Sequence, residues 1–73
     1  MIISVAHFQI LKAAEERDEE GLTLSENQLS NDDLDYAQEL VDAGYLRKFA
    51  GINEALYTLT KKGEDEIRRL ERG

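Results

Sequence analysis

The sequence predicts a small α+β fold that is mainly helical and carries one β-hairpin. Three observations predict this class. The chain has 73 residues, enough for one domain with a small core, and 41% of them are apolar. Apolar residues recur at helical spacing through most of the chain, whereas two segments after Gly44 are rich in aromatic residues and resemble strands. We therefore expect one domain spanning residues 1–73.

The first segment has the pattern of an amphipathic helix. Ser4 is a suitable N-cap, and Ile3 and Phe8 flank it at the spacing of a hydrophobic staple. The apolar positions that fit one helical face are Val5, Phe8, Ile10, Leu11 and Ala14. Gly21, which follows the polar run 15–20, is a good helix stop. A helix between Ser4 and Gly21 is expected.

A short strand and a short helix should follow this first helix. Residues 22–24 alternate between apolar and polar side chains, as a strand does. Ser25 and Gln28 have the spacing of a capping box, in which each side chain bonds a backbone N–H near the other. This pair predicts a short helix over about 26–30.

A longer helix is expected over about 32–44. Either Ser30 or Asn31 is a suitable N-cap, and Gly44 is a suitable stop. The residues that share one face of this helix are Leu34, Ala37, Leu40, Val41 and Gly44. This face should pack on the core.

The C-terminal part predicts a β-hairpin and a last helix. The strand-like segments are 45–49 and 55–59, and the residues 50–54 between them include Gly and Asn, which tolerate positive φ. Thr60 is a suitable N-cap for a helix over 61–72. The expected order is therefore α-β-α-α-β-β-α.

This order is that of a winged helix-turn-helix. The segments LVDAGYLRK (40–48) and YTLTKKGEDEI (57–67) resemble winged-helix regulators of the MarR and PadR types. The tract LSENQLSNDDLDYAQELVDAGYL (24–46) is similar to the small uncharacterised YjcQ-like family of bacteria and their phages. The resemblance spans about 8–70. It implies a fold and a bacterial or phage origin but not a specific task, because one fold hosts many functions.

In DNA-binding relatives the helix before the hairpin enters the major groove and presents hydrogen-bond donors there. Here that helix has no Lys or Arg, and at about 100° per residue four carboxylates form one stripe: Asp32, Asp35, Glu39 and Asp42. Like charges at this spacing cost roughly 0.2–0.5 kcal/mol per pair. The stripe is either a solvated face or a protein-binding face, and Tyr36 at its edge is a candidate interface anchor.

Charge is divided unevenly along the chain. The net charge of -7 arises from -9 over residues 1–44 and +2 over residues 45–73. The basic residues nearest the expected wing are Arg47, Lys48, Lys61 and Lys62. They are a candidate patch for nucleic-acid phosphates, for an acidic partner or for a second copy, and the alternative is scattered solubilising charge.

No catalytic or cofactor site is expected. His7 is the single histidine and has no nucleophile or carboxylate at a fixed spacing, so it is expected on a helix surface or at the core edge. The chain has no cysteine and no glycine-rich phosphate loop. Residues 31–42 have part of a calcium-loop spacing, but Tyr36 occupies the position that requires Gly. We expect no enzyme activity, no cofactor, no metal and no small-molecule substrate.

A cytoplasmic location is expected. The chain has no cysteine, no basic residue before Lys12 and no apolar run of about 18 residues. The leading functional hypothesis is a non-enzymatic regulatory module that binds a protein through its acidic helix. One alternative is a DNA-binding transcription regulator that uses the wing. Another is an acidic, phage-type inhibitor that occupies a basic nucleic-acid site on another protein.

Overall fold

A computed structural model describes all residues 1–73 as three α-helices, one 3₁₀ turn and a three-stranded antiparallel sheet. The elements in chain order are α1 (Val5–Glu19), β1 (Leu24–Ser25), η1 (Glu26–Gln28), α2 (Asn31–Asp42), β2 (Leu46–Ala50), β3 (Ala55–Leu59) and α3 (Lys61–Arg72). The predicted α+β class is confirmed. The sheet order is β1-β3-β2, so β2 is an edge strand.

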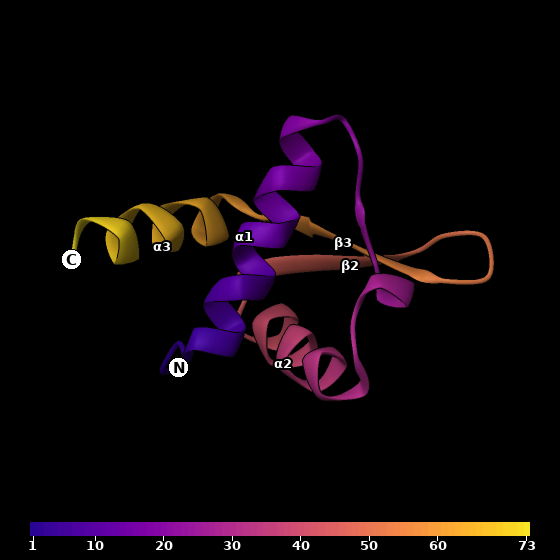
Figure 1. The fold of residues 1–73 in the computed structure, drawn as a ribbon, viewed down its shortest axis with the longest axis horizontal. Coiled ribbons are helices and arrows are strands. Elements are labelled where there is room, and N and C mark those ends of the chain that lie inside the picture. The colour runs from indigo at the N-terminus through magenta and orange to yellow at the C-terminus, as the bar shows by residue number, and fades with distance from the viewer.

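Helix α1 lies at the centre of the molecule. It packs on α2, on β3 and on α3, and Figure 1 shows it between α3 on one side and the hairpin of β2 and β3 on the other. The hairpin and α3 extend in opposite directions, which gives the molecule its long axis of 38 Å against 25 and 17 Å for the other two.

The helix starts follow from local capping chemistry. Ser4, Ser30 and Thr60 each have an extended backbone, and the side-chain oxygen of each accepts from the N–H three residues later. Ser30, not the residue after it, is therefore the cap of α2. Gly21 and Gly44 follow α1 and α2 with φ of 75° and 88°, a backbone conformation that favours glycine.

Two short elements differ from expectation. The strand expected at 22–24 is Leu24–Ser25, because the N–H of Leu22 is used to close α1 by donating to Arg17 O (2.8 Å). The helix expected at 26–30 is the 3₁₀ turn Glu26–Gln28. The predicted Ser25–Gln28 capping box is nevertheless present, and within three residues it sets a turn and not an α-helix.

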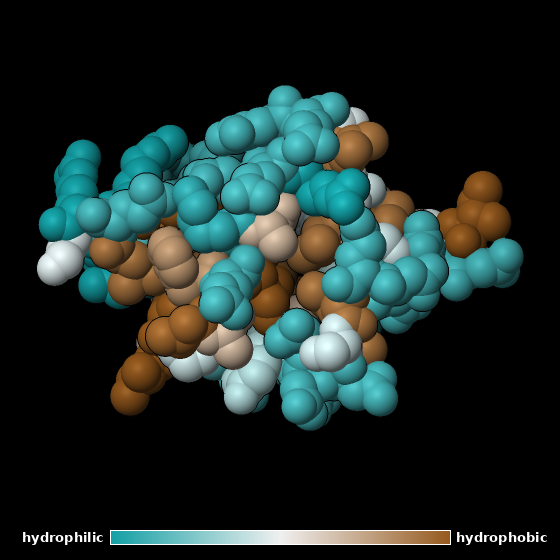
Figure 2. All heavy atoms as spheres, viewed as in Figure 1, coloured by the Kyte–Doolittle hydropathy of each residue, from teal (hydrophilic) through white to brown (hydrophobic).

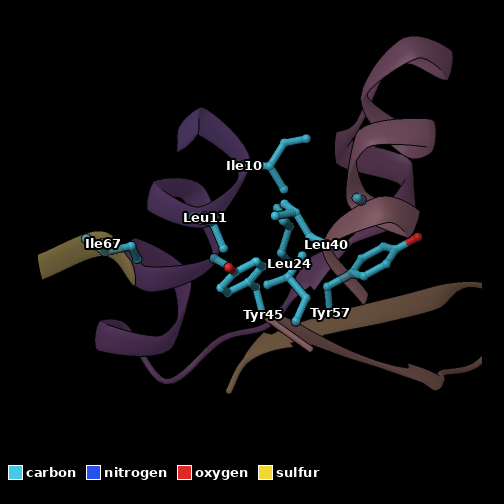
Figure 3. Packing of buried hydrophobic residues seen from close by; sticks show 10 residues of the cluster. Ile10, Leu11, Leu24, Leu40, Tyr45, Tyr57 and Ile67 are labelled. Atoms are coloured by element: carbon cyan, nitrogen blue, oxygen red, sulfur yellow. The ribbon is translucent and has the colours of Figure 1, made fainter. Parts of the chain in front are cut away.

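One apolar cluster joins the helices to the sheet. Its ten buried residues are Ile10, Leu11, Ala14, Leu24, Ala37, Leu40, Tyr45, Leu46, Tyr57 and Ile67. In Figure 3 the labelled side chains of α1, α2 and the strands gather between these elements, and Ile67 lies on α3 beside α1. Of the face predicted for the long helix, Ala37 and Leu40 are fully buried and Leu34 and Val41 are half-buried.

Helix α3 sits against the end of the hairpin through its first turn. The Thr60 N–H donates to Tyr45 O (3.2 Å), and the Thr60 hydroxyl donates to Gly44 O (2.6 Å). Gly63 is buried there, and a Cβ at this position would overlap the carbonyl oxygen of Tyr45. The segment from Leu59 to Gly63 therefore docks α3 closely on the hairpin.

Candidate functional site

The exposed face of α2 collects most of the predicted protein-binding residues. Asp32, Asp35, Tyr36 and Glu39 line one shallow hollow on the surface. Asp42 lies farther along the same helix, is exposed, and accepts a hydrogen bond from Gln38 Nε2 (2.9 Å). We call these five predicted residues the acidic face of α2: Asp32, Asp35, Tyr36, Glu39 and Asp42.

Glu39 differs from the other carboxylates because His7 holds it. His7 Nε2 lies 2.7 Å from Glu39 Oε1, and the His7 residue is only 5% exposed. The Ser4 N–H donates to His7 Nδ1 (3.0 Å), so Nδ1 is an acceptor and the ring proton of the neutral imidazole resides on Nε2. His7 therefore donates to Glu39 and fixes that carboxylate at the surface.

Tyr36 is half-buried and is not a free anchor. Its ring and the His7 ring form a T-shaped pair, with centroids 4.9 Å apart and planes at 77°. His7 thus positions both Tyr36 and Glu39. Two members of the acidic face are therefore held in place by a buried side chain.

Of the two positions expected for His7, a helix surface or the core edge, the structure shows the core edge, and its role toward Glu39 and Tyr36 was not predicted. A local signal exists, because Ser4 and His7 have capping-box spacing with His in the position usually taken by Glu or Gln. The contact with Glu39 has no local signal, since the two residues are 32 positions apart.

The four predicted basic residues do not form one free patch. Lys62 Nζ donates to Ala43 O (2.7 Å) at the C-terminal end of α2 and lies 4.7 Å from the centre of the Tyr45 ring. Lys62 therefore satisfies an end carbonyl of α2, where a cation is also favoured by the helix dipole. Lys61 Nζ pairs with Asp65 (3.0 Å) within α3.

Arg47 and Lys48 lie on the edge strand β2 and are both exposed. They are consecutive in a strand, so their side chains leave opposite faces of the sheet. Lys48 Nζ donates to the neutral Gln38 Oε1 of α2 (3.3 Å), and no hydrogen bond or ion pair is formed by the Arg47 side chain. Arg47 and Lys48 thus share no contact partner with Lys61 or Lys62.

Ionisation is perturbed outside the acidic face. A side-chain hydrogen bond to Glu66, together with burial, raises the pKa of the Tyr45 phenol, and burial raises the pKa of Tyr57. Glu15 and Glu71 both accept from Lys12 and raise its pKa. These shifts reflect packing and ion pairing between α1, the hairpin and α3.

No three side chains among His, Asp and Glu are arranged to hold a metal ion. None of the helices combines the length and the apolar character needed to cross a bilayer. Comparison of the chain with family models, with curated proteins and with solved structures found no significant match.

Proposed function

We propose that the chain is a winged helix-turn-helix that acts as a non-enzymatic regulatory module and binds a protein through the acidic face of α2. The position of α2 directly before the β2–β3 hairpin supports this fold assignment, as does the resemblance of residues 24–46 to the YjcQ-like family. In such a fold this helix is the usual contact element. Here its exposed face is suited to cations, not to phosphates.

The observation that most supports protein binding is that the acidic face of α2 is exposed and that part of it is held in place. Its acidic residues have no Lys or Arg bound to them, and Glu39 is fixed by a buried histidine. Such a face attracts a basic surface at long range and loses little side-chain entropy on contact. The partner we propose is a basic protein surface, and a nucleic-acid-binding site on another protein has this chemistry.

DNA binding through the wing is the second candidate, and the exposed Arg47 and Lys48 favour it. It is weaker because Lys62 is engaged with Ala43 O and Lys61 with Asp65. The acidic face next to these cations would also repel a phosphate backbone.

A pull-down from a bacterial extract at two salt concentrations tests the proposal. The test variant combines Asp32→Asn with Asp35→Asn, which leaves the His7–Glu39 contact intact. The control combines Asp18→Asn with Glu19→Gln, an equal charge change on exposed residues at the end of α1. We expect the wild type and the control to capture one basic protein in a salt-sensitive manner, and the test variant to lose it.

Two results would overturn this function. One is equal capture of that protein by the test and control variants. The other is a gel shift of duplex DNA at low salt that Arg47→Glu with Lys48→Glu abolishes, which would support the DNA-binding alternative.

A further inference from the structure

Strand β2 leaves one side of its backbone open. It pairs with β3 only, and it forms the outer edge of the sheet. Tyr45 O accepts from the Thr60 N–H at one end of the hairpin, and the Gly51 N–H donates to Glu54 O at the other. Hydrogen-bonded pairs alternate along an antiparallel ladder, so positions 47 and 49 face β3. The N–H and C=O groups of Lys48 and Ala50 therefore point to the open side.

This open side is accessible. Residues 47–50 are all exposed, although α2 packs on the core side of β2. Figure 1 shows the far part of the hairpin extending beyond the helices. An exposed strand edge of this kind is a template for pairing with another extended chain.

The hairpin is held firmly enough to act as such a template. Glu54 Oε2 accepts from Ser25 Oγ of β1 (2.6 Å) and from Asn27 Nδ2 of η1 (2.7 Å), which ties the end of the hairpin to both elements. Glu26 Oε1 accepts from the first N–H of β3 (2.9 Å). Pairing with β2 would therefore order the incoming chain without having to order the hairpin.

Side chains beside this edge indicate what would pair with it. On the sheet face away from the core, Arg47 and Phe49 lie two positions apart, and Phe49 is 41% exposed beside its cross-strand partner Leu56. Arg47 has no carboxylate partner, and Lys48 on the other face contacts only a neutral amide. The edge thus presents two cations and an apolar side chain.

A second copy fits this edge poorly. In the register centred on Lys48, antiparallel pairing of β2 with β2 would place the two Lys48 side chains opposite one another, and like charges opposite one another are destabilising. In every register a second β2 offers no carboxylate to Arg47 or Lys48. The same cations would favour carboxylates on an incoming strand. The occupant that fits is therefore a different chain with acidic residues.

We propose that β2 binds an extended acidic segment of another protein, which adds to the sheet as a fourth strand. Main-chain hydrogen bonds to Lys48 and Ala50 supply much of the affinity. Selectivity comes from the outer face, where a carboxylate lies beside Arg47 and an apolar side chain two positions away lies beside Phe49. This surface is separate from the acidic face of α2 and does not depend on it.

The test titrates the full chain with a synthetic peptide of about eight residues, the length of an ordinary strand. The peptide repeats Glu-Thr-Val-Thr, so that a carboxylate and an apolar side chain lie two positions apart on one face of the strand. Amide resonances of the protein are followed by NMR, and affinity is followed by fluorescence anisotropy. We expect shifts centred on Lys48 and Ala50, with slower exchange of their amide protons. A peptide with Lys in place of Glu should not bind, and N-methylation of alternate peptide amides should abolish binding.

Protein variants separate this site from general charge attraction. Arg47→Glu should weaken the acidic peptide about tenfold or more, as loss of a charge-assisted contact does. Lys61→Glu makes an equal charge change at an exposed position outside the edge and should retain binding. Asp32→Asn with Asp35→Asn should also retain it, so the result is independent of the function proposed for α2.

The inference is overturned by any of four outcomes. Two concern the peptides: equal binding of the acidic and the basic peptide, and resonance shifts centred on α2. A third is an equal effect of Arg47→Glu and Lys61→Glu on affinity for the acidic peptide. The fourth is a chain that binds duplex DNA through Arg47 and does not bind the acidic peptide. A dimer that pairs β2 with β2 in sedimentation and NMR would likewise exclude an acidic strand as the occupant.

Discussion

His7 connects three parts of the molecule with one side chain. Its Nδ1 accepts from the Ser4 N–H at the start of α1, its Nε2 donates to Glu39 on α2, and its ring meets Tyr36. Because His7 is 5% exposed, loss of either hydrogen-bond partner, Ser4 or Glu39, leaves a ring nitrogen shielded from water. This single residue therefore couples the cap of α1 to the geometry of the acidic face.

Replacement of His7 by Ala should lower the free energy of unfolding by about 1–3 kcal/mol, from the lost capping bond and the lost interhelix bond. Glu39→Gln keeps an acceptor oxygen opposite Nε2 and should cost less. Urea denaturation of both variants measures the difference. A His7→Ala variant as stable as Glu39→Gln would show that the two hydrogen bonds contribute little.

Lys62 and Lys61 are neighbours with different contacts, so they form a matched pair. Lys62→Met removes the bond to Ala43 O but keeps an apolar chain over Tyr45, and it should cost about 0.5–1 kcal/mol. Lys61→Met removes only an exposed pair within α3 and should change stability by less than about 0.5 kcal/mol. Thermal melts compare the two, and equal effects would argue against a capping role for Lys62.

At the scale of elements, Gly63 determines how closely α3 approaches the hairpin. Gly63→Ala places a methyl group on the Tyr45 carbonyl, so α3 must move away from its seat. We expect a loss of about 2 kcal/mol or more, which is typical of overpacking against a rigid backbone. Glu64→Ala, one residue later in the same helix, is the control. Denaturation curves that coincide for the two variants would contradict this account of α3 docking.

The carboxylates of the acidic face of α2 should lower the stability of the folded chain while they favour binding of a basic partner. Asp35 has like-charged neighbours in Asp32 and Glu39, each worth roughly 0.2–0.5 kcal/mol of repulsion. Asp35→Lys converts both repulsions to attractions, so it should raise the melting temperature while weakening capture of a basic partner. A lower melting temperature of this variant would show that repulsion among the carboxylates does not destabilise the fold. Unchanged capture of the partner would show that Asp35 does not contribute to binding.

Sequence patterns located these elements because their boundaries depend on neighbours in the chain. The caps at Ser4 and Thr60 and the stop at Gly44 are decided within a few residues, and all three are present in the structure. Lys62 and Ala43, by contrast, meet across 19 positions, and His7 and Glu39 meet across 32. Such contacts depend on how helices pack, which periodicity does not specify. The acidic face could therefore be predicted from the sequence, whereas the contact of His7 with Glu39 and that of Lys62 with Ala43 could not.

At the scale of the whole molecule, the uneven charge follows the architecture. Carboxylates cover α2 and the end of α1, whereas cations lie on β2 and α3. Figure 2 shows hydrophilic atoms over much of the surface that faces the viewer. It shows brown, apolar atoms near the N-terminus and at the end of the hairpin. The exposed apolar residues in these two regions are Met1, Ile2, Val5 and Ile52. The two proposed binding surfaces thus have opposite charge and would take partners of opposite charge.

The stability of the folded chain should also fall at alkaline pH, because three groups have raised pKa values in the folded state. The folded state raises the pKa of Tyr45, through Glu66 and burial, and of Tyr57, through burial. The pKa of Lys12 shifts in the same direction through Glu15 and Glu71, but its side chain is partly exposed and contributes less. A group whose pKa is higher in the folded state makes its full contribution to folding stability when the pH is below its pKa in the unfolded chain. That contribution is lost as the pH rises through the folded value.

Thermal melts should therefore change little between neutral pH and about pH 9 and should fall above about pH 10, the unfolded pKa of tyrosine. The fall has a specific origin, because ionised Tyr45 would place a phenolate beside the Glu66 carboxylate within the core that seats α3. Tyr45→Phe keeps the ring and removes the ionising group, so it should make the alkaline decline shallower. Tyr36→Phe removes an equal hydroxyl from the acidic face and should leave the slope as in the wild type. If both variants decline as steeply as the wild type, the alkaline transition does not arise at Tyr45, and Tyr57 becomes the group to replace next.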